Sequence, residues 1–452
     1  MDNAPTYDVI IAGSGIGGLC ATRSAQESGA RVLVIEKANQ IGGSAAASGG
    51  TIWTARNLEE WSKVQPSGNT ALGQTLVNGF KPGVEWLRSL GLQVTDVEDR
   101  PYKFKRDIVR LDPDPRTAFE SLAQRIEADG GTIRTETAIT GIERDNGRTS
   151  AVSVSTPSGS ERIATSALIL ATGGFQGNAE LRARYMGPWS DRMILRGVPE
   201  NTGDGLLAAI DAGARTSGPF SRFYGHYLPA PPAEVGLHNF VLVKPDFSEY
   251  AITINLRGER FDDEFLGDEV TVHSLIHQPE GMGVLLFDQH IRDNMEQYSQ
   301  WPTSDVDRVR NIRDAGGHVM EADTWKSLAE QMATEWQVPA ATALQTISAY
   351  NTTCQDQNGT ALTVPKSGGL VALETPPYYA VRVLAGITYT YGGVTINPSA
   401  EILDSSDRPI PGLYAAGADC GGIYTRGYTG GLSMGLVFGR IAGQTAAAYS
   451  RG

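Results

Sequence analysis

The amino-acid sequence predicts an α/β protein in which a parallel sheet is built from both ends of the chain. A second unit of mixed helices and strands is expected between those ends. Three observations predict this fold. A strand, a glycine-rich turn, a helix and another strand follow one another near the start, strand-and-turn segments return after residue 386, and the residues between differ in composition. At 452 residues the chain is too long for one compact core, so two domains are expected.

The first strand ends in a turn whose glycines have the G-x-G-x-x-G spacing. Gly13 allows the tight turn, Gly15 lets the backbone approach a pyrophosphate, and Gly18 lets the following helix pack closely on the strand. The pyrophosphate would then accept hydrogen bonds from N–H groups at the helix N-terminus. Glu36 ends the second strand, 31–36, where a carboxylate can accept hydrogen bonds from a ribose. Together these features predict an adenine dinucleotide site. The alternative is a glycine-rich turn in an ordinary α/β domain.

The remaining elements follow from apolar spacing and turn residues. The loop Ile41–Gly50 holds few large side chains, so it can follow a ligand closely. Asp145–Arg148 is predicted to be a hairpin turn between strands 139–143 and 151–156. The other predicted elements are helices over 20–30, 73–90, 116–129 and 432–448, a strand over 132–137, and a buried strand at Ala167–Gly174 that ends in a glycine turn.

The change in composition defines the expected domain boundaries. Residues 1–218 are assigned to the first part of the nucleotide-binding domain and residues 386–452 to its second part. Residues 219–385 carry Pro-rich loops and amphipathic segments at 323–336 and 340–350, and they are predicted to form an inserted cap domain.

Composition excludes several classes of function. The net charge of −13 argues against a nucleic-acid or anionic-membrane partner, and the longest apolar runs are too short to span a bilayer. Three scattered cysteines form neither a C-x-x-C pair nor a metal-ligand spacing, so no disulfide and no metal site are expected. Cys20 is expected to pack in the core. The short polar segment Met1–Thr6 holds no signal peptide, so a cytoplasmic location is expected.

A set of motifs in order along the chain resembles one flavoprotein family. The motifs are Gly13–Gly18, Glu36-Lys37, Gly42–Ser44, Ala171–Phe175, Asn201–Gly205, Gly258–Phe261 with Glu264, Thr390–Gly393, Pro409–Gly417 and Phe438–Gly443. This family contains the fumarate reductase and succinate dehydrogenase flavin subunits, tricarballylate dehydrogenase-like enzymes and 3-ketosteroid dehydrogenases. The resemblance implies FAD as cofactor. It also implies a Rossmann-like FAD-binding domain (GR2-type) built from both chain ends, with an inserted α+β cap domain.

The resemblance also implies which residues hold FAD. Ala138 would contact the adenine through its backbone, and Asp204 and Asp419 would reach the ribityl or ribose region, although either acid could instead cap a helix or turn. Residues 41–54 contain no His of the kind that tethers flavin in the succinate dehydrogenase group, so non-covalent FAD is expected. The full set of expected cofactor residues is Gly13, Gly15, Gly18, Glu36, Lys37, Gly43, Ser44, Gly49, Gly50, Ala138, Thr172, Gly173, Asp204, Gly417, Asp419, Leu432 and Ser433.

The expected active-site positions depart from the fumarate reductases. Asp268 stands where those enzymes have a proton-donating Arg and the ketosteroid dehydrogenases a Tyr base. A carboxyl could do this work if desolvation raised its pKa, although it could also be a solvated loop acid, and His273 is a second candidate. Thr388 and Tyr428 stand where fumarate reductases clamp a substrate carboxylate with His and Arg. Both cationic anchors are thus absent, although nearby Arg426 could partly substitute.

Tyr428 instead resembles the Tyr that polarises a ketone in the ketosteroid dehydrogenases, with help from the backbone N–H of Leu432. The alternative is an aromatic residue that packs against the flavin edge. His226 aligns with a substrate-contacting His at the entry to the cap domain, and with Tyr428 and Asp268 it is a candidate catalytic residue. Tyr389 and Tyr391, with Tyr224 and Tyr227, are expected to form an aromatic wall for a ring-shaped or apolar substrate.

Three functions therefore stay open. The first is an FAD-dependent dehydrogenase that desaturates a small carbonyl substrate, a cyclic ketone or keto acid. Asp268 or a Tyr in its place would remove the α-proton, Tyr428 would hold the enolate, and the β-hydride would go to flavin N5. The second is an ene-reductase of the fumarate-reductase type, which runs the same geometry backwards. The third is a non-catalytic flavin-binding relative. No haem motif or ferredoxin cysteine pattern is present, so a separate electron partner is expected: O2, a quinone or a carrier.

Overall fold

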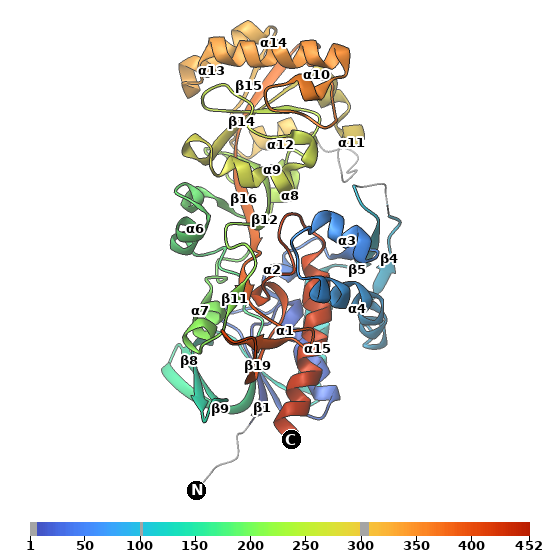
Figure 1. Ribbon diagram of the computed structural model, residues 1–452, viewed down its shortest axis with the longest axis vertical. Coiled ribbons are helices and arrows are strands. Elements are labelled where there is room, and N and C mark those ends of the chain that lie inside the picture. The colour runs from blue at the N-terminus through green and yellow to red at the C-terminus, as the bar shows by residue number, and fades with distance from the viewer. Residues whose placement is uncertain (1–6, 100–102, 299–306) are drawn as a thin grey trace. The chain divides into compact units, whose positions relative to one another are not determined.

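The computed structural model describes residues 7–99, 103–298 and 307–452 (Figure 1). The segment Met1–Thr6, where no signal peptide was expected, lies outside the described residues. The chain forms two compact units. Unit 1 comprises residues 1–178, 197–223 and 389–452, and unit 2 comprises residues 179–196 and 224–388. Residues 179–196, which the sequence analysis assigned to the first part of the nucleotide-binding domain, therefore cluster with unit 2.

Unit 1 is an α/β domain whose elements come from both ends of the chain. Its helices are α1 (Ile16–Glu27), α2 (Gly43–Ala46), α3 (Leu58–Val64), α4 (Thr70–Ser89), α5 (Pro115–Ala128), α7 (Asp204–Asp211), the short 3-10 helix η5 (Gly417–Asp419) and α15 (Gly431–Arg451). Its strands are β1 (Tyr7–Ala12), β2 (Val32–Ile35), β3 (Thr51–Ala55), β4 (Val94–Asp96), β5 (Arg106–Leu111), β6 (Thr132–Arg134), β7 (Ala138–Asp145), β8 (Arg148–Thr156), β9 (Gly159–Leu170), β11 (Thr216–Ser217), β17 (Gly393–Val394), β18 (Glu401–Leu403) and β19 (Pro409–Ala415).

The main sheet of unit 1 joins the two ends of the chain. Its strand order is β18-β19-β9-β1-β2-β6, and the antiparallel hairpin of β7 and β8 extends it at β9. The strands β19, β9, β1, β2 and β6 run parallel to one another, whereas β18 pairs antiparallel with β19. The inner strands β1, β2 and β9 carry continuous apolar runs because helices cover a parallel sheet on both faces. This is the Rossmann-like domain that the sequence predicted.

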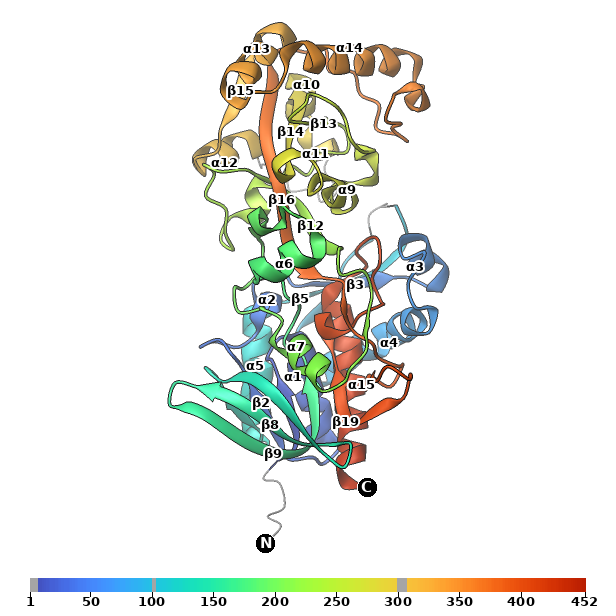
Figure 2. The ribbon, with the colours of Figure 1, turned by 60° about the vertical axis from the view of Figure 1, so that its left-hand side comes forward.

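The first glycine turn has the conformation that its motif predicts. Gly13 has φ +105°, in the left-handed region that favours glycine, and a Cβ on Gly18 would lie 1.9 Å from the carbonyl oxygen of Gly13. Helix α1 consequently begins at Ile16, directly after the turn, rather than at residue 20. Helix α15 lies beside α1 (Figures 1 and 2), and the hydroxyl of Ser24 donates to the carbonyl of Arg440 at 2.8 Å. Cys20 is fully buried in the core between these elements, as expected.

Unit 2 is an α+β domain around a mixed sheet. Its helices are α6 (Ala179–Met186), α8 (Phe240–Val243), α9 (Asp268–Leu275), α10 (Gln289–Asp293), α11 (Met295–Tyr298), α12 (Arg308–Asp314), α13 (Trp325–Trp336) and α14 (Ala340–Asp356), with 3-10 turns η1 (Ser190–Arg192), η2 (Glu264–Leu266), η3 (Pro279–Gly281) and η4 (Gly359–Ala361). Its strands are β10 (Ile194–Leu195), β12 (Phe223–Pro229), β13 (Ile252–Asn255), β14 (Met282–Asp288), β15 (Val319–Ala322) and β16 (Tyr378–Thr390).

Strand β16 organises unit 2. It pairs with β10, β12, β14 and β15, and β13 pairs with β14 at the other side. The motif at Gly258–Phe261 with Glu264 has a structural role here. The carboxylate of buried Glu264 accepts hydrogen bonds from Arg260 at 2.9 and 2.5 Å and lies 3.5 Å from the Lys366 ammonium. These cations and the Thr253 N–H hold the pKa of Glu264 below its usual value although burial would raise it.

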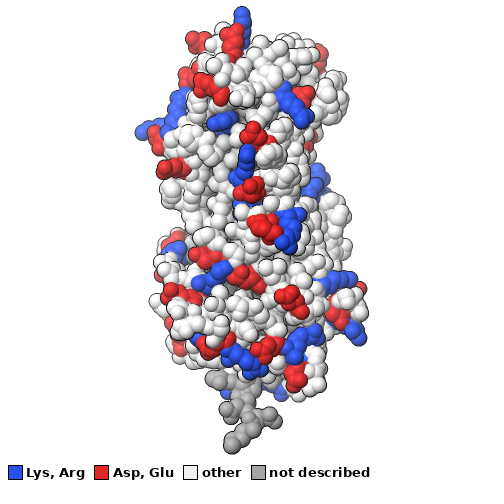
Figure 3. Space-filling model, turned by 90° about the vertical axis from the view of Figure 1, so that its left-hand side faces the viewer, with Lys and Arg blue, Asp and Glu red and all other residues white. Residues whose placement is uncertain are grey.

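No helix among the described residues is both long enough and apolar enough to span a bilayer. On the face shown in Figure 3, acidic and basic side chains are mixed, and neither sign forms a continuous patch.

Candidate active site

Three glycine turns of unit 1 surround the N-terminus of α1 and leave room for a ligand. A Cβ on Gly15 would meet only the Gly42 carbonyl oxygen, 3.9 Å away, and a Cβ on Gly43 would meet only the Cα of Gly15, 4.0 Å away. A Cβ on Gly417 would find no atom within 4 Å, although the Gly417 N–H lies close to Gly17 of α1. Within the described part of the chain, no side chain caps α1. The cradle and its uncapped N–H groups therefore fit a pyrophosphate.

Glu36 connects this cradle to the end of β2. One carboxylate oxygen accepts from the Ser14 N–H at 2.9 Å and from the Ser14 hydroxyl at 2.6 Å, and the other accepts from the Ala38 N–H at 2.8 Å. The side chain is 8% exposed. These donors hold the carboxylate at the strand end, where the sequence predicted contact with a ribose.

Lys37 and Asp204 form an ion pair that the sequence did not predict. The Lys37 ammonium donates to Asp204 at 2.9 Å and to the Thr202 hydroxyl at 2.6 Å. Thr202 in turn donates to the second Asp204 oxygen at 2.7 Å. Asp204 is the first residue of α7, so its charge also favours the helix N-terminus. Lys37 and Asp204, both expected to contact the cofactor, thus lie together, and Asp204 also begins α7.

Asp419 lies buried beside Thr172 and Gly173. Its carboxylate accepts from the Thr172 hydroxyl at 3.0 Å and from the Gly173 N–H at 3.1 Å, and the side chain is 2% exposed. Burial raises the pKa of Asp419 to about 7, with a smaller contribution from Asp204, because these hydrogen bonds only partly offset the loss of water. A ligand hydroxyl that donates a hydrogen bond to Asp419 would favour its ionised form.

Tyr428 lies in the loop that precedes α15, three residues before the helix begins at Gly431. The Gly431 N–H donates to the Tyr428 hydroxyl oxygen at 2.8 Å, and the Tyr424 hydroxyl and the Ser433 hydroxyl both donate to the Gly430 carbonyl, at 2.6 and 2.7 Å. Leu432 and Ser433 occupy the first turn of α15, whose N–H groups carry partial positive charge. Tyr428 therefore lies at a helix end that favours negative charge.

Tyr428 belongs to an aromatic cluster in unit 1 that includes both predicted tyrosines. Its ring makes edge contacts with Trp53 at 5.1 Å and Tyr389 at 5.9 Å between centroids, and Tyr389 in turn contacts Tyr391 at 5.8 Å. Trp53 of β3 was not identified from the sequence, because a buried Trp on a short strand looks like ordinary core. Of the four tyrosines expected in one wall, Tyr224 and Tyr227 belong to unit 2.

Gln65 is a second residue that sequence reasoning missed. Its buried side chain accepts from the backbone N–H of Thr425 at 2.7 Å and of Arg426 at 3.2 Å, and donates to the Gly427 carbonyl at 2.5 Å. It thereby fixes the loop that precedes Tyr428. The Arg426 side chain is exposed, and no described residue pairs with it. No sequence signal marks a lone Gln that holds a distant loop.

A hydrogen-bonded relay occupies unit 2. The Nδ1 of His226 lies 2.9 and 3.0 Å from the two oxygens of Asp268, and its Nε2 lies 3.0 Å from the Tyr224 hydroxyl. The Tyr227 N–H also donates to Asp268, at 3.1 Å, and the Lys244 ammonium is 3.4 Å from Nδ1. His226 is 1% exposed and Asp268 is 4% exposed. The structure thus brings two of the three predicted catalytic residues together.

The charge states in this relay correct one expectation. The sequence analysis required desolvation to raise the pKa of Asp268. Burial does act in that direction, but His226, Lys244 and the Tyr227 N–H outweigh it and lower the pKa of Asp268 to about 2. Burial lowers the pKa of His226 to about 3 against the pull of Asp268. The pair is therefore a carboxylate and a neutral imidazole at neutral pH, and Asp268 is neither a solvated loop acid nor a poised acid.

The other predicted residues have simpler surroundings. Ser44 follows Gly43 in α2, and its hydroxyl accepts from the Val198 N–H at 3.2 Å. Ala138 begins β7 opposite Ser155. Gly49 and Gly50 precede β3, and a Cβ on Gly49 would meet no atom within 4 Å. His273, the second candidate for the base, is buried on α9.

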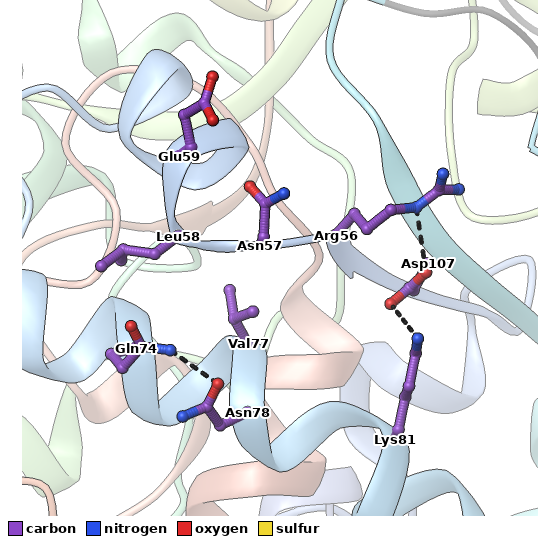
Figure 4. A pocket seen from close by; sticks show the side chains of 9 residues that line it. All are labelled: Arg56, Asn57, Leu58, Glu59, Gln74, Val77, Asn78, Lys81 and Asp107. Carbon is purple, nitrogen blue, oxygen red and sulfur yellow. Dashed lines mark hydrogen bonds and ion pairs between the residues drawn. The ribbon is translucent and has the colours of Figure 1, made fainter.

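A groove of about 550 Å³ lies elsewhere in unit 1, between the start of α3 and one face of α4 (Figure 4). Ion pairs of Asp107 with Arg56, at 3.4 Å, and with Lys81, at 3.3 Å, line one side of it. None of the predicted cofactor or catalytic residues lines this groove, so it is separate from the cradle around α1.

Comparison with known proteins identifies the class. The profile of a family described as an FAD binding domain matches residues 8–433. The chain therefore belongs to this family of FAD-dependent oxidoreductases, and FAD is its cofactor. The residues around α1 fit that cofactor, because the uncapped helix and the open glycine turns accept a pyrophosphate, and Glu36 stands where a ribose is bound.

Particular relatives share most of this chain. It is 27% identical over 484 residues to the NADH:fumarate oxidoreductase of Klebsiella pneumoniae (strain 342), covering 100% of this chain but 49% of that protein. The chain thus spans about half the length of that relative. It is 24% identical to the 4-oxocyclohexanecarboxylate 2-dehydrogenase of Sinomonas cyclohexanicum, covering 99% and 94% of the two chains. A 3-ketosteroid delta1-dehydrogenase from Sterolibacterium denitrificans shares the fold, with a TM-score of 0.79, 21% identity, and 98% and 100% coverage.

Proposed function

We propose that the protein desaturates a CH–CH bond next to the carbonyl of a cyclic ketone or keto acid. The observation that carries this proposal is the Tyr428 hydroxyl, which accepts from Gly431 at the N-terminal turn of α15. A neutral phenol in that position donates to an enolate oxygen without requiring a carboxylate partner. Two similar proteins carry names that describe dehydrogenation of a cyclic ketone, and in one of them the ketone is also a carboxylic acid. These names support the same reaction class.

Tyr428 polarises the carbonyl in this proposal and holds the enolate as the α-proton leaves. The helix dipole of α15 and the N–H of Leu432 add partial positive charge beside the oxygen. The tyrosine and tryptophan rings around Tyr428 supply apolar surface for a ring-shaped substrate and keep water away from the phenol. Bound FAD supplies the two-electron acceptor for the β-hydride.

The α-proton is taken up by the relay of unit 2. Neutral His226 carries its proton on Nδ1 and donates it to Asp268, so its Nε2 lone pair accepts the hydrogen of the Tyr224 hydroxyl. As the Tyr224 oxygen takes the α-proton, its own proton passes to Nε2. Asp268 acts through His226 as a positioning residue, and this replaces the direct role for Asp268 that the sequence suggested.

The Tyr428→Phe variant tests this function. Loss of one donor to a developing oxyanion costs roughly 10²- to 10³-fold in rate. We therefore expect anaerobic bleaching of the flavin by 4-oxocyclohexanecarboxylate or a 3-ketosteroid to slow by about that factor. Tyr449→Phe, on α15 but in contact with Tyr414 instead, is the matched control and should bleach at the unaltered rate. Full activity in Tyr428→Phe would remove the proposed role.

The reverse reaction, reduction of an activated C=C bond, is the alternative function. It is favoured by the relative named as an NADH:fumarate oxidoreductase. The same residues serve both directions, so the flavin potential and the electron partner decide. An enone that reoxidises the reduced flavin, while no ketone bleaches the oxidised flavin, would establish this alternative. If neither ketones bleach the oxidised flavin nor enones reoxidise the reduced flavin, the protein binds flavin without turnover.

We further propose that FAD is held without a covalent bond and that a separate acceptor, O2, a quinone or a carrier, removes its electrons. The absence of His from residues 41–54 supports the first point. Acid precipitation should then leave the yellow colour in solution.

Three buried, unpaired cysteines are consistent with a reducing, cytoplasmic location, which localisation of the tagged protein would test. The net charge of −13 makes nucleic acid an unsuitable partner.

A further inference from the structure

One arginine of unit 2, Arg196, is surrounded by aromatic rings and a hydroxyl group. Arg196 follows β10, and its Nη1 donates to the Thr388 hydroxyl at 3.1 Å. Its guanidinium carbon lies 4.5 Å from the ring centre of Phe240 and 5.3 Å from that of Tyr224. Among the described residues no Asp or Glu pairs with it, and its buried Nε has no hydrogen-bond partner. Two buried arginines of unit 2, Arg260 and Arg308, pair with Glu264 and Asp246, and a third, Arg182, donates to the backbone carbonyls of Ser190 and Asp191.

The surroundings of Arg196 restrict the position of its guanidinium. Two aromatic rings contact it, and one donor group is already used by Thr388. A half-buried cation without a counter-ion costs free energy unless an anion binds it, and a guanidinium offers paired donors that match a carboxylate.

We propose that Arg196, with Thr388, binds the carboxylate of the substrate, so that the substrate is a keto acid rather than a neutral ketone. This rests on the proposed function for the reaction itself. The cationic anchor that the sequence lacks at residue 388 is supplied instead by a neighbouring strand, which presents Arg196 to the Thr388 hydroxyl. Arg196 also touches Tyr224, the first member of the proton relay, so the anchor and the relay share one side chain.

Binding measurements with the flavin-loaded protein test this inference without turnover. The probes are cyclohexanecarboxylate, which has no ketone, and 4-oxocyclohexanecarboxylate with its uncharged methyl ester. Binding is followed by calorimetry. Arg196→Gln should weaken binding of both carboxylates roughly 10- to 100-fold, the range for a charge-assisted contact, and should leave the methyl ester nearly unchanged. Thr388→Val should have a smaller effect in the same direction.

Two further variants keep the result interpretable. Arg192→Gln removes the same charge four residues earlier, where the guanidinium is 44% exposed and pairs with Glu280, and it should bind every probe normally. Arg196→Lys keeps the charge and should retain part of the affinity for the carboxylates. Unaltered flavin content and melting temperature would show that the Arg196 variants are folded.

The outcomes separate the two proposals. Equal weakening of carboxylate and ester by Arg196→Gln, or no weakening at all, would overturn the carboxylate site. Preferential loss of carboxylate binding supports it even if no ketone bleaches the flavin. In that case the desaturase proposal fails while the anionic-substrate proposal stands.

Discussion

The contact between Asp268 and His226 decides which imidazole nitrogen can accept a proton. The carboxylate accepts from Nδ1–H, which leaves the Nε2 lone pair facing the Tyr224 hydroxyl at 3.0 Å. Burial raises the pKa of Tyr224 to about 12, against the opposing effect of Arg196. The phenol therefore stays protonated in the physiological range and exchanges its proton only when Nε2 can receive it.

Asp268→Asn should break this relay with little change in packing. The amide can donate to Nδ1, which moves the imidazole proton to Nε2 and prevents His226 from accepting from Tyr224. In a serine protease the same exchange at a buried acid costs about 10⁴-fold in kcat, and we expect a fall of roughly 10²- to 10⁴-fold in flavin reduction rate here. Stopped-flow bleaching at saturating substrate would measure it.

The dissociation constant for substrate provides the control for that variant. It should stay near that of the unmodified protein, because Asp268 is not proposed to touch substrate. An unaltered reduction rate in Asp268→Asn would show that the relay carries no proton. A raised dissociation constant with a normal rate would reassign Asp268 to binding.

Asp419 makes the stability of the flavin-free protein depend on pH. Its pKa is raised to about 7 in the folded state from an ordinary value of 3.8. The folded state therefore holds this proton more tightly than the unfolded state does. Its contribution to stability is fully present below pH 3.8 and is lost as the pH rises through about 7. Each unit of pKa shift corresponds to about 1.4 kcal/mol, so the loss is on the order of a few kcal/mol.

Asp419→Asn should remove this pH dependence. The amide keeps the size of the side chain and cannot ionise, so the apoprotein variant should lose less stability than the unmodified apoprotein between pH 5 and pH 8. Urea unfolding of both proteins across that range would measure the difference. Parallel stability curves for the two apoproteins would mean that Asp419 titrates normally.

Sequence reasoning could assign an expected role only to residues that belong to a local motif, and those roles stay predictions. Glu36, Asp204 and Tyr428 each follow a recognisable glycine-containing stretch, and the structure places each at a strand end or helix start. Trp53, Gln65 and Arg196 act across long stretches of chain, so no local pattern marked them. The lowered pKa of Asp268 could not be predicted for the same reason, because His226 and Lys244, which lower it, are distant in sequence.

At the scale of elements, the turn between β1 and α1 contains one glycine that folding requires and another that cofactor binding requires. A Cβ on Gly18 would lie 1.9 Å from the Gly13 carbonyl, whereas a Cβ on Gly15 would face open space to 3.9 Å. Gly15 has φ −65°, which alanine also adopts. Gly18 is therefore needed for packing, whereas Gly15 leaves room for the ligand.

Gly15→Ala and Gly18→Ala should consequently give opposite results. Gly15→Ala should fold, with apoprotein stability within about 1 kcal/mol of the unmodified value, and should bind FAD at least roughly tenfold more weakly because the methyl group occupies the cradle. Gly18→Ala should lower the stability itself, since overpacking costs about 1–3 kcal/mol. FAD titration and urea unfolding of the two apoproteins would distinguish them.

The pair also provides its own test of the cradle. Normal FAD affinity in Gly15→Ala would mean that the pyrophosphate lies elsewhere. Normal stability in Gly18→Ala would mean that α1 can move away from β1 without cost.

The elements that the sequence predicted well were those with a strong period or a turn signal. The hairpin at Asp145–Arg148, helices α4 and α5, and the last helix all formed within a few residues of the predicted bounds. The short strands β3, β4 and β5 and the helix α3 were not predicted, because three to seven residues carry too little periodicity. Tertiary pairing of β3 with β5, rather than local preference, defines that sheet.

At the scale of the whole molecule, unit 1 is closed by hydrogen bonds at the points where the chain leaves and returns. The Gly177 N–H donates to the Asn201 carbonyl at 2.8 Å, on either side of the excursion through residues 179–196. The Tyr391 N–H donates to the Arg222 carbonyl at 3.0 Å, on either side of the longer excursion. The composition of the sequence indicated the longer inserted segment. The shorter segment has only 18 residues, too few to change the local composition visibly.

The pairing of β9 with β19 determines when this protein can finish folding during synthesis. Strand β9 ends at Leu170, and the strand that completes its edge spans Pro409–Ala415. While the ribosome translates the residues between them, the nascent chain presents the open edge of an apolar strand that could pair with another chain. Slow elongation through this interval would therefore favour aggregation, and chaperones that shield strand edges would matter most before the last helix emerges.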